Sequence, residues 1–240
     1  MKKRMVDAFK KEIEEDKEAP KVSEERVKET ITMNPRRQEI LQYLCRYPCT
    51  RMSKIAKDLE LSMAATKWHL KRLAEKRFIV KEEVNGDLVF YPANMISESE
   101  VDVFAAINHD RAIPILRKIL SNSGISQKNL YKEVQLNQRT VVRHAALLEK
   151  AGLIESIQDG IFKRYYPTEL IKNMNDNYRK RASGFRKHLL KILKKDGVNP
   201  KVVRYTDKAL HVKIIAGETK SVLELNTQPF ESVLEYYKGL

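Results

Sequence analysis

The chain has 240 residues, of which 42% are hydrophobic and 32% charged, and its 46 lysines and arginines against 32 aspartates and glutamates give a net charge of +14. This length fits one large domain or two to three small ones. Because the sequence has no long apolar run, no secretion signal and only two cysteines, we expect a cytoplasmic protein and exclude a membrane protein, a secreted mini-protein and a disordered chain.

Residues 1–33 are a charge-dense N-terminal extension. Its last part, from Ser23 to Met33, predicts a helix, because Ser23 is a good N-cap and Glu24 and Glu25 suit the first turn. The pattern leaves three roles open, namely an arm, a linker or a dimer contact.

Two copies of a small unit follow, at residues 34–96 and 97–171. A shift of 75 residues aligns apolar positions such as Ile40 with Ile115, and it aligns the Tyr-Pro pair at 91–92 with the pair at 166–167. The identity is low, but the matches fall on apolar positions and on the ends of the unit. We interpret them as two copies of one domain.

Each copy predicts the same order of elements. A helix with apolar residues three to four apart is followed by a short helix (52–59 or 127–134), a turn, and a longer helix starting at Ser62 or Asn137. A β-hairpin comes next, with turn signals at 85–86 (Asn-Gly) and 159–160 (Asp-Gly). This is the order of a winged helix, and an unrelated α+β repeat is the alternative.

The longer helices carry a family resemblance. The segment ATKWHLKRLAEKRFIV resembles the third helix and first wing strand of the ArsR/MarR-like winged-helix regulators, and TVVRHAALLEKAGLIE resembles them more closely. Gly152 stops the helix as in that family, whereas the first copy has Arg77 there. Two such units on a basic chain resemble the archaeal transcription regulators with two helix-turn-helix domains, a group that includes the archaellum transcription activator. The resemblance covers about residues 35–171.

The outward faces of the longer helices, with the wings, are the candidate DNA contacts, although a solvated basic face is the simpler alternative. Short or amide side chains would approach bases, and cations would reach guanine edges or phosphates. In the first copy the residues are Met63, Ala64, Lys67, Trp68, Lys71, Arg72, Arg77 and Lys81. In the second copy they are Gln138, Arg139, Val142, Arg143, Lys163 and Arg164.

Other conspicuous side chains favour structural roles. Trp68 either covers a sugar, packs on the wing or buttresses the neighbouring domain. His69 and His144 occupy matching positions, and we interpret both as structural. Cys45 and Cys49 have a spacing that could hold a soft metal, but no further ligand is near in sequence, so we prefer buried structural cysteines and expect no metal or cofactor.

Residues 172–196 predict a basic linker helix, with nine lysines and arginines against two aspartates. Tyr178, Phe185, Leu189 and Ile192 form a heptad-like seam in it. The seam either joins two chains in a homodimer or packs on its own chain. Residues 197–240 predict strands, a turn and a helix after Pro229, which make a small α+β module for dimerisation, ligand sensing or docking of basal transcription factors.

The predicted fold is therefore α+β and mainly helical, with two tandem winged helix-turn-helix domains, a basic helix and a small C-terminal α+β module. The sequence has no phosphate loop or hydrolase motif, so we do not expect an enzyme. We expect a sequence-specific double-stranded DNA-binding transcription regulator acting at promoters. The alternatives are an architectural or replication-associated DNA-binding protein with little sequence preference, and a protein-interaction scaffold.

Overall fold

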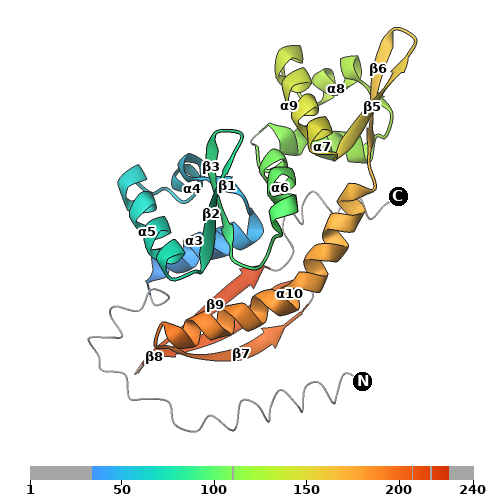
Figure 1. Cartoon of the computed structure of the whole chain (residues 1–240). Helices are drawn as coiled ribbons and strands as arrows, with labels where there is room; N and C mark the ends of the chain where they lie inside the picture. The colour runs from blue at the N-terminus through green and yellow to red at the C-terminus, as the bar shows by residue number, and fades with distance from the viewer. Residues whose placement is uncertain (1–33, 110, 207, 217, 227–240) are drawn as a thin grey trace, which may run out of the picture.

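The computed structural model describes residues 34–226 except 110, 207 and 217, so the helices expected at 23–33 and after Pro229 lie outside the described residues (Figure 1). The side chains of residues 172, 175, 176, 178 and 179 are also outside this description. Within the described part of the chain, no helix combines the length and apolar character that a membrane span requires.

The first unit is a helix-turn-helix followed by a β-hairpin, which together have the architecture of a winged helix. Asn34 caps its first helix by accepting from the Arg37 amide, and Ser62 caps its third by accepting from the Ala65 amide. Its antiparallel sheet has the order β1-β3-β2. The elements are α3 (Pro35–Arg46), β1 (Thr50–Arg51), α4 (Met52–Asp58), α5 (Met63–Glu75), β2 (Ile79–Val84) and β3 (Asp87–Pro92).

The second unit repeats this order. Its sheet has the order β4-β6-β5, and Asn137 caps α9 as Ser62 caps α5. Left-handed backbone conformations also recur 75 residues apart at four positions, for example at Glu60 (φ 52°) and Gln135 (φ 54°). The elements are α7 (Ala112–Ser121), β4 (Ile125–Ser126), α8 (Gln127–Glu133), α9 (Gln138–Lys150), β5 (Ile154–Asp159) and β6 (Phe162–Pro167).

One hairpin turn differs from the prediction. Asp159 is the last residue of β5 and pairs with Phe162, so the two-residue turn is Gly160–Ile161 and not the predicted Asp159–Gly160. Gly160 has a φ of 59°, and glycine at the first turn position suits a type II′ hairpin. The first unit has the predicted Asn85–Gly86 turn, with φ values of 50° and 83°.

A connector joins the two units into one core. It consists of a 3₁₀ turn, η2 (Glu98–Glu100), and α6 (Val101–Ile107), which packs on α7 and α9 of the second unit and on β2 of the first. Phe104 and Ile107 of α6 are buried in the same apolar cluster as the cores of both units. Asn108 donates from Nδ2 to the Pro48 carbonyl at 3.3 Å and to the Thr50 hydroxyl.

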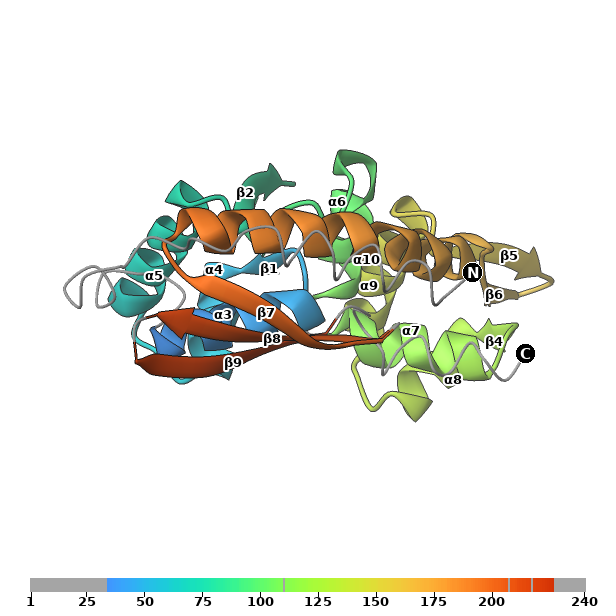
Figure 2. The same cartoon turned by 90° about the horizontal axis from the view of Figure 1, so that it is seen from below.

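The C-terminal part is a long helix, α10 (Leu170–Lys195), and an antiparallel sheet with the order β7-β8-β9 (Figure 2). The strands are β7 (Asn199–Tyr205), β8 (Ala209–Ala216) and β9 (Thr219–Asn226). Strand β9 packs on α3, where Gln38 and Ser221 exchange hydrogen bonds of 3.0 and 3.1 Å. The sheet therefore belongs to the same body as the first unit.

Of the two alternatives for the apolar seam of α10, the described residues support packing on their own chain. Phe185, Leu189 and Ile192 are only 1%, 1% and 7% exposed, because they pack in their own chain's core with the buried side chains of β8. The side chain of Tyr178 lies outside the description. The apolar pattern correctly marked the buried side of α10, but the cover comes from the same chain.

Candidate nucleic-acid interface

Helix α5 has one buried and one exposed side. Thr66, His69, Leu70 and Leu73 are buried, as a helical repeat of 3.6 residues requires for a face packed on α3 and α4. All of the helix residues predicted to contact DNA are exposed. These are Met63, Ala64, Lys67, Trp68, Lys71 and Arg72.

The cations of α5 differ in their surroundings. Lys71 and Arg72 lie 3.9 and 3.3 Å from the Glu75 carboxylate in exposed pairs. Such pairs contribute only about 0–1 kcal/mol, so exchanging them for phosphate contacts costs little. Among the described residues Lys67 has no ion-pair partner, and it lies in the N-terminal half of α5, the half that approaches bases in helix-turn-helix proteins.

Trp68 is held by a residue that the sequence analysis did not single out. The guanidinium of Arg37, in the first turn of α3, lies 4.8 Å from the centre of the indole ring. Arg37 is buried, and burial together with the charge of Arg72 lowers its pKa. The ring therefore packs on Arg37 of α3, and it remains 51% exposed. In the sequence, the N-cap residue Asn34 was the signal that could have placed Arg37 in the first turn of α3.

Helix α9 presents the equivalent face. Val141, His144, Ala145 and Leu148 are buried. The predicted contacts on α9 are all exposed, namely Gln138, Arg139, Val142 and Arg143.

The two matching histidines are buried under these faces. Burial, followed by the charges of neighbouring His109 and Arg143, lowers the pKa of His144 to about 4, and the ring centres of His109 and His144 lie 4.3 Å apart. Burial and then Arg37 lower the pKa of His69. Both rings are therefore neutral at neutral pH, which supports the structural interpretation.

The wings support DNA contact less than the helices do. Lys163 lies 3.5 Å from Glu149, and Arg164 donates to Asp159 at 2.6 Å and to the Gly124 carbonyl at 3.1 Å. Both cations therefore already have partners within the second unit.

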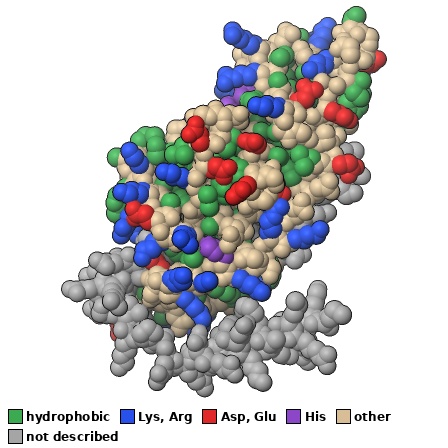
Figure 3. All heavy atoms as spheres, in the orientation of Figure 1, with side chains coloured by type: hydrophobic (Ala, Val, Ile, Leu, Met, Phe, Trp, Pro, Cys, Tyr) green, Lys and Arg blue, Asp and Glu red, His purple; other side chains and the backbone are tan. Residues whose placement is uncertain are grey.

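The first wing is acidic. Lys81 is exposed, but so are Glu83 and Asp87, and acidic side chains gather over the β2–β3 hairpin in Figure 3. The tip of this wing also meets the second unit, where Lys150 donates to the Asn85 side chain at 3.5 Å. A phosphate contact by Lys81 has little support, and the composition of this hairpin could have shown this beforehand.

Cys45 and Cys49 are buried, and burial raises the pKa of both thiols. In the described residues no cluster of three or more His, Cys, Asp or Glu side chains could hold a metal ion. The burial supports structural cysteines.

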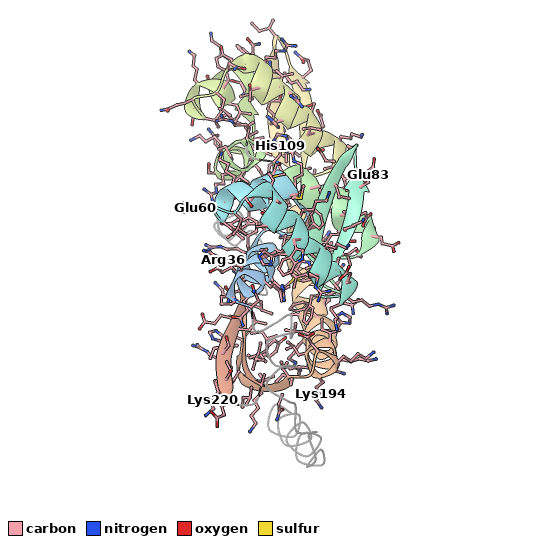
Figure 4. The ribbon with its side chains drawn as sticks, turned by 90° about the vertical axis from the view of Figure 1, so that its left-hand side faces the viewer. Arg36, Glu60, Glu83, His109, Lys194 and Lys220 are labelled. Atoms are coloured by element: carbon pink, nitrogen blue, oxygen red, sulfur yellow. The ribbon has the colours of Figure 1, made fainter. Side chains whose placement is uncertain are left out.

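The outward faces of α5 and α9 lie on the same side of the molecule. Figure 1 shows α5 on the left side of the first unit and α9 on the left side of the second, and Figure 4, which views that side, shows them one above the other and running in a similar direction. Arg77 lies in the turn that follows α5 and is exposed.

Comparison with known proteins assigns the first of these units. Residues 33–80 match the family described as winged helix-turn-helix DNA-binding. The chain is also similar to an uncharacterized HTH-type transcriptional regulator of Methanocaldococcus jannaschii, with 25% identity over 143 residues, which are 60% of this chain and 36% of that protein. The match thus covers well under half the length of that relative. It contains a winged helix-turn-helix DNA-binding domain and resembles an archaeal transcription regulator.

Proposed function

We propose that this protein is a sequence-specific double-stranded DNA-binding transcription regulator that acts in the cytoplasm by binding and not by catalysis. One observation carries the proposal: α5 and α9 each bury one face and present a face rich in lysine, arginine and glutamine on the same side of the molecule. Placing a helix in the major groove is how such domains read sequence.

The second unit is proposed as a second DNA-binding winged helix. Its support is the repeated sheet order, the equivalent caps of α5 and α9, and the left-handed residues 75 apart. We infer that the protein belongs with the archaeal regulators that have two helix-turn-helix domains. Bound at a promoter, it would help or block basal transcription factors.

The proposed contacts follow from the chemistry of the exposed side chains. Met63 and Ala64 are suited to thymine methyl groups, and Lys67 to phosphate or guanine. On α9, Gln138 can bind adenine through two hydrogen bonds, and Arg139 can bind guanine in the same way. The chemistry of Gln138 and Arg139 favours a reader of sequence over an architectural protein, whose contacts would be with the backbone.

Fluorescence anisotropy tests the proposal. Promoter fragments from the source genome, including the region upstream of the protein's own gene, are compared with random duplex at physiological salt. We expect a preference of ~1000-fold or more for particular fragments, the lower range for specific DNA binding. Equal affinity for every duplex would favour the architectural alternative, and no binding would favour the scaffold.

A further inference from the structure

The solvent side of α10 carries lysines that the proposed function does not use. Between residues 180 and 195 the sequence has no aspartate or glutamate. We call its exposed lysines the α10 track; they are Lys180, Lys187, Lys191, Lys194 and Lys195.

Helix geometry places these lysines in one line. At 3.6 residues per turn they fall within an arc of about 100° and span about 22 Å of the helix axis. Ala182, Phe185 and Leu189 are buried on the other side of the helix. Gly184 lies within the arc, and a Cβ added there would meet nothing within 4 Å, so the middle of the track is open.

The track is anchored beside the end of α5. His188 Nε2 lies 3.2 Å from the Arg77 carbonyl oxygen, and Lys76 lies 4.0 Å from Asp196, which follows α10. The exposed side chains of Lys76 and Arg77 thus extend the basic surface. Figure 3 shows lysine and arginine side chains gathered over α10 and the lower end of α5.

The chemistry of the track fits a phosphate backbone better than a membrane or a protein. Within the described part of α10, no large apolar side chain is exposed. A helix lying on a membrane inserts bulky apolar residues, and protein interfaces are enriched in aromatic ones. Contacts with DNA phosphates need only cations and polar groups.

We propose that the α10 track, together with Lys76 and Arg77, is a second DNA-binding surface that holds the backbone of duplex DNA without reading its sequence. It lies on a face beside the one that carries α5 and α9, with Lys194 at the margin of the view in Figure 4. Its length of about 22 Å corresponds to roughly six base pairs at 3.4 Å each. The inference rests on the proposed function, because its partner is the same DNA.

The test compares two triple variants of the full chain. Lys187→Gln, Lys191→Gln and Lys195→Gln remove three charges from the track. The matched control removes three from the outer face of the C-terminal sheet, through Lys201→Gln, Lys213→Gln and Lys220→Gln. Lysine and glutamine have similar helix propensities, so an unchanged circular dichroism spectrum and unfolding midpoint are expected for the track variant.

The readout is the affinity for a random 60-base-pair duplex and for a preferred promoter fragment over a range of salt concentrations. We expect the slope of log K, the binding constant, against log salt to become less negative by about 2 to 3 in the track variant. Each phosphate contact contributes about −0.9 to this slope. The ratio of promoter to random affinity should stay unchanged, and the control should keep the wild-type slope.

An unchanged slope in the track variant would overturn the proposal, and so would an equal loss in both variants, which would indicate an effect of net charge alone. A changed promoter-to-random ratio would also overturn it, because the track would then read sequence. These results differ from those expected if the proposed function itself is wrong. In that case the wild-type protein would show no promoter preference or no DNA binding.

Discussion

Arg77 and Gly152 occupy the same position of the two units, and both have left-handed backbones, with φ of 61° and 72°. The hydrogen bonds around them also match. The amides of Arg77 and Gly152 donate to the Ala74 and Glu149 carbonyls, both at 2.9 Å, and the following amides donate to Leu73 and Leu148, both at 3.0 Å. Helices α5 and α9 therefore end in the same αL turn, with glycine in only one of them.

This relationship predicts opposite effects of exchanging the residue types. Arg77→Gly should raise the free energy of unfolding by about 1 kcal/mol, because a side chain disfavours the left-handed conformation. Gly152→Ala should lower it by a similar amount, since the added Cβ would meet Leu170 Cδ2 at an ordinary 3.5 Å and only the backbone conformation is costly. Chemical denaturation of both variants measures this, and a shift in the same direction would contradict it.

Trp68 should report directly on DNA binding. It is the only tryptophan in the sequence, so the protein's indole emission comes from this one exposed ring on α5. We expect a saturable change in emission on adding duplex DNA, reversed by high salt as phosphate contacts are lost. Unchanged emission at saturating DNA would mean that the duplex binds away from this part of α5.

Arg139→Ala should weaken binding to a preferred site by about 1–3 kcal/mol and relax the preference at one base pair. Arg204→Ala, at an exposed position in β7 far from α9 in the sequence, is the control and should leave that preference intact. Binding to a library of single-base variants of the site provides the measurement. A uniform loss across the library would assign Arg139 to the backbone instead of a base.

His144 should make the folded state sensitive to mild acid. Its pKa is about 4 in the folded protein, mainly because of burial, against about 6.5 in an unfolded chain. As the pH falls, the unfolded state therefore binds the extra proton first. The contribution of neutral His144 to the free energy of unfolding is fully present above about pH 6.5, and it decreases by up to about 1.4 kcal/mol per pH unit toward pH 4. Denaturant midpoints across this range measure the effect.

His144→Gln should flatten that part of the pH dependence. Leu147→Ala on the same helix is the control, which should lower stability at every pH but keep the slope. Equal slopes in wild type and His144→Gln would show that other groups cause the acid sensitivity.

Cys45 and Cys49 should resist thiol reagents in the folded protein. Both are buried and their pKa values are raised, so neither forms the reactive thiolate at neutral pH. Titration with a thiol-specific reagent should find no rapid reaction until denaturant is added, when both should react. Rapid modification under native conditions would reopen the sensor alternative.

Local chemistry predicted the helices and their faces well. The longer helices begin at Ser62 and Asn137 as predicted, and these residues cap α5 and α9, because an N-cap depends only on the next few residues. The inward positions of α5 follow from the helical repeat, which is also local.

Contacts between distant segments were not predictable in this way. The stacking of Arg37 on Trp68 joins α3 to α5, and the burial of Phe185 and Leu189 depends on strands that follow them in sequence. An apolar pattern identifies which side is buried, but not what covers it. The ion pair between Lys163 and Glu149 joins the second wing to α9 and was likewise not predicted.

The connector through α6 and Asn108 has a consequence for the DNA itself. Both units share one apolar core, so α5 and α9 are held in a fixed relative orientation. The distance between the two helices is therefore set by the protein and not by the DNA. On B-DNA, with about 10.5 base pairs per turn, inserting about five base pairs between two recognised segments would rotate one of them to the opposite side of the duplex. In the proposed function, recognition of a DNA site therefore depends on the number of base pairs between the two contacted segments as much as on the bases within them.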